Sequence, residues 1–140
     1  MTLVIDASVV IKWYVTENDS DAATALLDAE QNFLAPDLLF AECASILAKL
    51  VRRGAMTTQR SLEIIAAIID GPFATVTNAQ LVDDALRISL SAPGVSPYDA
   101  QYVALAILFN TNCVTADRKL VERLSGMPAN HVTLLADYVH

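Results

Sequence analysis

Side chains that commonly hold zinc are scarce in this sequence. The two cysteines, Cys43 and Cys113, lie far apart and neither belongs to a CxxC pair, so a thiolate metal site or a redox motif has no support. We expect two buried free thiols and a reducing cytoplasm. The two histidines, His131 and His140, lack metal-ligand spacing, and we interpret both as surface residues.

The chain also lacks a long uninterrupted apolar run and a basic leader. Its apolar start is broken by Asp6, and the apolar stretch 100–116 contains Gln101 and three polar residues at 110–112. We therefore expect neither a signal peptide nor a membrane helix, and a cytoplasmic protein.

Positive charge is in short supply. The formal net charge is −7, which argues against nonspecific affinity for nucleic acid. Two bound divalent cations would add four positive charges and leave −3, so RNA is not excluded. Hydrophobic residues make up 54% of the chain and charged residues 18%. This balance predicts that some apolar surface is buried in a subunit interface, as in a homo-oligomer.

Glycine and proline occur singly at plausible joints, without a linker or a repeat, and we predict a single domain over residues 1–140. Short β-rich runs, brief enough for buried parallel strands, occur at residues 2–5, 33–35, 74–77, 113–115 and 132–135. Helical patterns cover residues 19–29, 36–53, 57–69, 78–90 and 96–109, the second opening with Pro36 and the third at a Thr57 cap. This alternation predicts a three-layer α/β/α fold with a mostly parallel sheet of about five strands.

Four carboxylates interrupt apolar segments, and they are the most informative residues of the chain: Asp6, Glu42, Asp99 and Asp117. Parallel sheets bind ligands at the carboxyl ends of their strands, where Asp6 and Asp117 are expected. At separations of about 5 to 7 Å and an effective dielectric constant near 20, each ionised pair would repel by roughly 2 to 3 kcal/mol. A converging set therefore predicts a hard divalent cation, Mg²⁺ or Mn²⁺, and phosphodiester hydrolysis.

Each carboxylate also has a purely local interpretation. Asp6 and Asp117 suit the N-caps of the helices that follow them. Glu42 suits the first turn of a helix, and Asp99 follows Ser96 in the pattern of a capping box. Four independent caps remain an alternative to one converging site.

The segments VIDASVVIKW, ECASIL, SPYDAQYVALA and VTADRKL together resemble PIN-domain ribonucleases, especially VapC-type toxins of type II toxin–antitoxin systems. The resemblance covers nearly the full length and implies a PIN-like fold, a Mg²⁺-dependent endoribonuclease, an RNA substrate such as tRNA or rRNA, a cognate antitoxin and a homodimer. It implies four catalytic acids, Asp6, Glu42, Asp99 and Asp117, of which Asp6, Asp99 and Asp117 hold metal and Glu42 orients water or a second ion. Ser8 and Thr115 would support the site, or serve as ordinary turn hydroxyls.

Many relatives carry Asn three residues after the helix acid, where this chain has Ser45, so the polar contacts around Glu42 are expected to differ. Candidate cations for gripping RNA are Lys12, Lys49, Arg52, Arg53, Arg118 and Lys119, with Trp13 or Tyr14 for base stacking. The isoleucines at 64, 65, 68 and 69 would face the antitoxin, a second subunit or the core.

Two other functions compete with this interpretation. Another Mg²⁺-dependent phosphoryl-transfer enzyme would also place Asp6 after its first strand. However, a receiver domain needs an Asp after the third strand, where this chain has Val76-Thr77-Asn78, and a dehalogenase-type phosphatase needs DxD where it has Asp6-Ala7-Ser8. A noncatalytic PIN-like interaction module is the second alternative, although all four acids are present.

Overall fold

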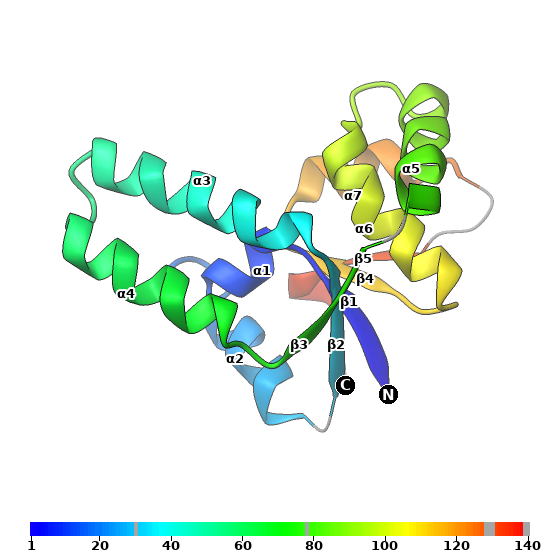
Figure 1. Cartoon of the computed structure of the whole chain (residues 1–140). Coiled ribbons are helices and arrows are strands. Elements are labelled where there is room, and N and C mark those ends of the chain that lie inside the picture. The colour runs from blue at the N-terminus through cyan, green and yellow to red at the C-terminus, as the bar shows by residue number, and fades with distance from the viewer. Residues whose placement is uncertain (30, 78, 128–130, 139–140) are drawn as a thin grey trace.

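A parallel sheet forms the centre of the computed structural model, which describes residues 1–29, 31–77, 79–127 and 131–138. Within these residues the sheet has five strands in the order β3-β2-β1-β4-β5 (Figure 1). The strands are β1 (Thr2–Ile5), β2 (Asn32–Pro36), β3 (Phe73–Val76), β4 (Cys113–Thr115) and β5 (Val132–Leu134). The chain order reverses at β1, which pairs with both β2 and β4. The predicted sheet is thereby confirmed, with boundaries within one or two residues.

Burial follows position in the sheet. Leu3, Val4 and Ile5 of the central strand are at most 1% exposed, because strands and helices surround them. The prediction that every strand is buried is wrong for β3, where Ala74 and Thr75 are exposed. This strand lies at the edge and pairs on one side only.

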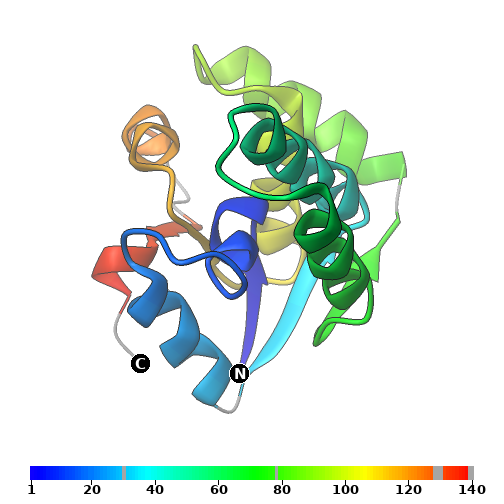
Figure 2. The ribbon, with the colours of Figure 1, turned by 90° about the vertical axis from the view of Figure 1, so that its left-hand side faces the viewer.

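Helices cover both faces of the sheet, as predicted. They are α1 (Ala7–Ile11), α2 (Ser20–Asp28), α3 (Leu38–Arg52), α4 (Thr58–Ile69), α5 (Ala79–Ser91), α6 (Pro97–Leu108), α7 (Arg118–Leu124) and the 3₁₀ turn η1 (Leu135–Asp137). Helices α1 to α4 lie on one side and α5 and α6 on the other (Figure 1), while α7 contacts β5. Helices α3 and α4 form a hairpin that extends away from the sheet and is seen nearly end-on in Figure 2.

Capping side chains set most helix starts. Thr57 accepts a hydrogen bond from the Arg60 amide, and Ser96 accepts one from the Asp99 amide, as their sequence patterns predict. The prediction that Pro36 opens a helix is wrong: Pro36 ends β2 opposite Val76, and α3 begins at Leu38. Asn78, predicted to open a helix, lies outside the described residues.

Trp13 belongs to the hydrophobic core. Its indole N–H donates to the Ala23 carbonyl at 2.8 Å, and its ring lies 5.4 Å from the Phe33 ring and 6.1 Å from the Phe73 ring, centroid to centroid. These contacts fix the α1–α2 connection against the sheet. Trp13 is therefore not placed to stack on a base.

The cysteine prediction is confirmed, since Cys43 and Cys113 are buried free thiols. Burial raises the pKa of Cys43 to about 12 and that of Cys113 well above its usual value. His131 is half-buried, with Nδ1 2.7 Å from the Thr111 carbonyl oxygen, so it is not the freely exposed residue expected, and His140 lies outside the described residues. Among those residues, no helix combines the length and apolar character that a membrane span requires.

Candidate active site

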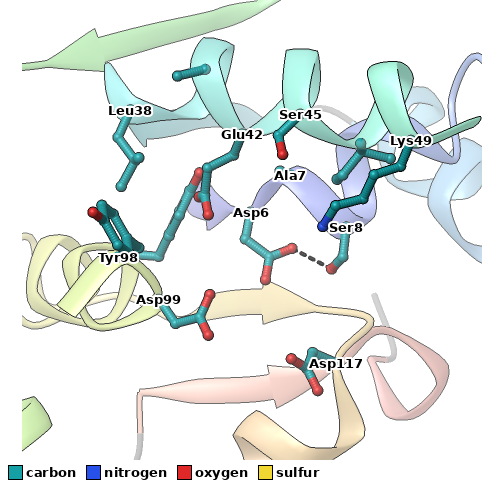
Figure 3. A pocket seen from close by; sticks show the side chains of 13 residues that line it. Asp6, Ala7, Ser8, Leu38, Glu42, Ser45, Lys49, Tyr98, Asp99 and Asp117 are labelled. Atoms are coloured by element: carbon teal, nitrogen blue, oxygen red, sulfur yellow. Dashed lines mark hydrogen bonds between the residues drawn. The ribbon is translucent and has the colours of Figure 1, made fainter. Parts of the chain in front are cut away.

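All four predicted carboxylates line one pocket of about 410 Å³ (Figure 3). Asp6 comes from the end of β1 and Asp117 from the end of β4, while Glu42 is on α3 and Asp99 on α6. The pocket thus lies beyond the carboxyl ends of the central strands, between helices from opposite faces of the sheet, where α/β proteins commonly bind ligands. Ser8, Ser45 and Lys49 share its lining.

Asp6 is the most buried of the four acids, with 6% of its surface exposed. Its Oδ1 accepts hydrogen bonds from Ser8 Oγ at 2.5 Å and from the Val9 amide at 3.3 Å, so it caps α1 while its carboxylate faces the pocket. Burial raises its pKa to about 6, and the charge of Asp99 adds to this, against the hydrogen bonds that favour the ionised form.

Two hydroxyl groups, those of Ser8 and Thr115, hold the Asp6 carboxylate in position. Ser8 Oγ donates to Asp6 and accepts from the Ala116 amide at 2.9 Å. Thr115 is fully buried; its Oγ1 lies 3.4 Å from Ser8 Oγ and accepts from the Asp117 amide at 3.0 Å. This network ties the exits of β1 and β4 together. Ser8 reaches the pocket, whereas Thr115 is outside its lining.

Asp117 and Asp99 are both held at helix starts. Asp117 caps α7 by accepting from the Leu120 amide at 3.2 Å. Asp99 lies in the first turn of α6, where its own amide is bonded to Ser96. Burial and the charge of Asp117 raise the pKa of Asp99, while the Ser96 hydroxyl and Arg123 oppose this rise. An acid can therefore hold a helix start and line the shared pocket at the same time, so the two interpretations of the sequence do not exclude each other.

Glu42 is half-buried on α3, as its place beside the apolar stripe predicts. Burial and the charge of Asp99 raise its pKa, whereas the nearby Tyr102 hydroxyl lowers it. That hydroxyl is buried and has no hydrogen-bond partner of normal geometry among the described residues. Asp99 thus interacts electrostatically with Asp6, Glu42 and Asp117, which makes it the centre of the acidic group.

The donor set of the pocket fits a hard divalent cation. Its lining among the described residues contains carboxylates and hydroxyls but no histidine or cysteine, and oxygen ligands favour Mg²⁺ or Mn²⁺ over zinc. In the parts of the chain that the structure describes, no three ligating side chains stand close enough to share an ion as they are.

The structure also reveals pocket residues that the sequence did not single out. Tyr98 and Tyr102 belong to the lining, together with apolar side chains of α3. The signal for Tyr102 was its position three residues after Asp99, which places both on one face of α6.

Of the six cations predicted near the site, all of them in described segments, Lys49 alone lines the pocket. Lys12 is withdrawn from it, since its Nζ lies 3.2 Å from Glu17 Oε2 and 2.6 Å from the Asn18 carbonyl oxygen. Ser45 lines the pocket at the position where an Asn was expected from the resemblance.

The fold and this pocket define an α/β protein with a carboxylate site at the point where the strand order reverses. The family model of the PIN domain matches residues 3–125. The chain is 32% identical over 129 residues to Ribonuclease VapC3 of Pyrobaculum aerophilum, covering 91% of this chain and 98% of that protein. The chain therefore belongs to the PIN-domain family.

Solved structures agree with this fold. VapC20 of Mycobacterium tuberculosis, described as a sarcin–ricin loop cleaving toxin, superposes with a TM-score of 0.68 at 15% identity, over 89% of this chain and 95% of that one. VapBC2 of Rickettsia felis, solved on a DNA fragment from its promoter, gives a TM-score of 0.66 at 11% identity, over 96% and 98%. The fold expected from the resemblance is confirmed.

Proposed function

We propose that this chain is a Mg²⁺-dependent endoribonuclease and the toxin of a toxin–antitoxin pair. The observation that carries the proposal is the convergence of four carboxylates, from four separate segments, on one pocket. The similarity to Ribonuclease VapC3 supports the ribonuclease activity.

Asp6, Asp99 and Asp117 would hold the metal, which when bound polarises the scissile phosphate and lowers the pKa of a bound water. Glu42 accepts a hydrogen bond from the attacking water and orients it toward phosphorus. Its raised pKa suits this role, because a carboxylate that binds protons more readily is a better base. Ser8 and Thr115 hold Asp6 in place.

A cognate antitoxin is the second partner, after RNA. The predicted isoleucine face of α4 is divided: Ile64 and Ile68 are buried in the core, whereas Ile69 is 58% exposed. Leu62 on the same helix is 59% exposed. These exposed side chains on the α3–α4 hairpin would pack against an apolar antitoxin segment.

A homodimer would bury a different surface. Val82, Leu86 and Leu90 recur every fourth residue along α5 and are 56%, 49% and 77% exposed. They form an apolar stripe, which is typical of an interface between copies of a chain. Light scattering of Leu86→Glu protein would show a monomer where the parent chain forms a dimer.

The experiment that tests the activity is cleavage of purified tRNA and rRNA, including a sarcin–ricin loop fragment, by antitoxin-free protein. Reactions contain Mg²⁺, Mn²⁺ or EDTA, with Asp99→Asn protein in parallel. We expect discrete cuts that need metal and disappear in the variant. Folded protein that binds metal and RNA without cutting would instead favour the noncatalytic interaction module. Hydrolysis of small phosphate esters alone would favour another phosphoryl-transfer enzyme.

A further inference from the structure

Lys49 has an unusual position for a cation. It is exposed on α3, it lines the acidic pocket, and its side chain points from the helix into the pocket toward Ser8 (Figure 3). Lys12 and Arg123 are engaged elsewhere, since Lys12 is paired with Glu17 and Arg123 donates to the Gly94 carbonyl. Arg52, Arg53, Arg118 and Lys119 are outside the lining of the pocket.

Lys49 itself forms no ion pair and no hydrogen bond with any residue that the structure describes. Four carboxylates share its pocket, so a lysine with a purely structural role would be expected to close on one of them. The ammonium group stays available to a ligand that comes from outside. An anion is the natural ligand of an ammonium group.

An RNA strand that enters the pocket meets a strongly negative surface. A phosphate that comes within a few ångströms of a carboxylate is repelled by it, because both groups carry negative charge. A metal held by these carboxylates would offset the repulsion at the scissile phosphate, and the phosphates on either side would gain less from it. Binding of these neighbouring phosphates therefore calls for a cation at the rim of the pocket.

The helix fixes where the Lys49 side chain starts relative to Glu42. Glu42, Ser45 and Lys49 recur at i, i+3 and i+7 and share one face of α3. With a rise of about 1.5 Å per residue, Lys49 lies roughly 10 Å along the helix from Glu42. From there its side chain enters the pocket on the Ser8 side, away from Glu42 (Figure 3).

We propose that Lys49 binds an RNA phosphate next to the scissile one and thereby sets the path of the strand into the pocket. This inference rests on the proposed ribonuclease function. It assigns Lys49 to substrate binding and not to the chemical step, so a loss of its charge acts on KM and leaves kcat nearly unchanged.

The test compares Lys49→Gln and Lys49→Arg with Arg60→Gln, which removes the same charge from an exposed position on α4 outside the pocket. Steady-state cleavage of an RNA substrate identified with the parent protein is measured at constant Mg²⁺ from 50 to 200 mM KCl. We expect Lys49→Gln to raise KM about tenfold, the size of one charge-assisted contact. The salt dependence of log kcat/KM should become shallower by about 0.7, the contribution of one phosphate contact on a single strand.

Lys49→Arg should keep most of the affinity, and Arg60→Gln should match the parent protein in both KM and salt dependence. If Lys49→Gln behaves like Arg60→Gln, the inference is overturned while the ribonuclease function stands. A fall in kcat at unchanged KM also overturns it and moves Lys49 to the chemical step. If the parent protein neither cuts nor binds RNA with metal present, the proposed function fails and this inference fails with it.

Discussion

Replacing Asp6 by Asn should stabilise the metal-free protein at alkaline pH. The Asp6 carboxyl is 6% exposed and burial raises its pKa from 3.8 to about 6. The difference corresponds to at most about 3 kcal/mol of unfolding free energy, because one pH unit is worth about 1.4 kcal/mol. The native state binds the proton more tightly than the unfolded chain. This contribution is therefore fully present below pH 3.8 and is lost as the pH rises through 6.

Asparagine at position 6 keeps the cap and removes the charge. Its side-chain oxygen can accept from Ser8 Oγ and from the Val9 amide as the carboxylate does. At pH 8 in EDTA we expect Asp6→Asn protein to be more stable than the parent chain by up to about 3 kcal/mol. At pH 4.5 the gap should shrink to about 1 kcal/mol, because Asp6 is then mostly protonated in the native parent chain but still mostly ionised in the unfolded chain.

Urea unfolding in EDTA at both pH values, followed by circular dichroism, measures this gap. Asp28→Asn, a matched change at an exposed position ending α2, should shift the free energy by less than about 0.5 kcal/mol at either pH. Adding Mg²⁺ at about 100 times its Kd should stabilise the parent chain by about 2.7 kcal/mol and the variant much less. An Asp6→Asn protein no more stable than its parent at pH 8 would refute the argument that burial of the charge is costly.

Three further substitutions test the surroundings of the site. Ser8→Ala leaves the Ala116 amide without its partner and should lower the free energy of unfolding by about 1 to 3 kcal/mol in urea titrations; an unchanged midpoint would contradict the hydroxyl network. Gly94→Ala places a Cβ 2.8 Å from Arg123 Nε at a φ of +85° and should cost about 1 to 2 kcal/mol by thermal unfolding, whereas a neutral effect would mean that the loop relaxes freely. Tyr102→Phe removes a buried hydroxyl that has no hydrogen-bond partner among the described residues and should stabilise the metal-free protein by about 1 kcal/mol yet slow RNA cleavage severalfold; unchanged cleavage would separate the hydroxyl from the function of the site.

Much of the fold could be predicted from the sequence because strands and helices alternate regularly. The order of the strands could not, since nothing local distinguishes the edge strand β3 from a central one. Pro36 illustrates the same limit: a proline suits the first turn of a helix and the end of a strand equally well. Its pairing with Val76, forty residues away, decides between them.

The four acids were recognisable because each one stands in an apolar segment. Their neighbours were harder to assign. Lys12 and Lys49 cannot be distinguished by their local sequence. They differ in the structure because Lys12 is paired with Glu17, whereas Lys49 lines the pocket. Tyr102 resembles an ordinary core aromatic until α6 places it beside Glu42. Residues whose role depends on long-range contacts are therefore the ones that local patterns miss.

The double role of Asp6 and Asp117, as helix caps and as pocket carboxylates, limits how this site can be lost. A change to Ala at either position removes a capping oxygen as well as a charge, and so weakens α1 or α7. A change to Asn, or to Ser, removes the charge and keeps the cap. Inactive descendants of this chain should accordingly retain small polar residues at both positions, and an inactive protein made for trapping an RNA complex should carry Asn there.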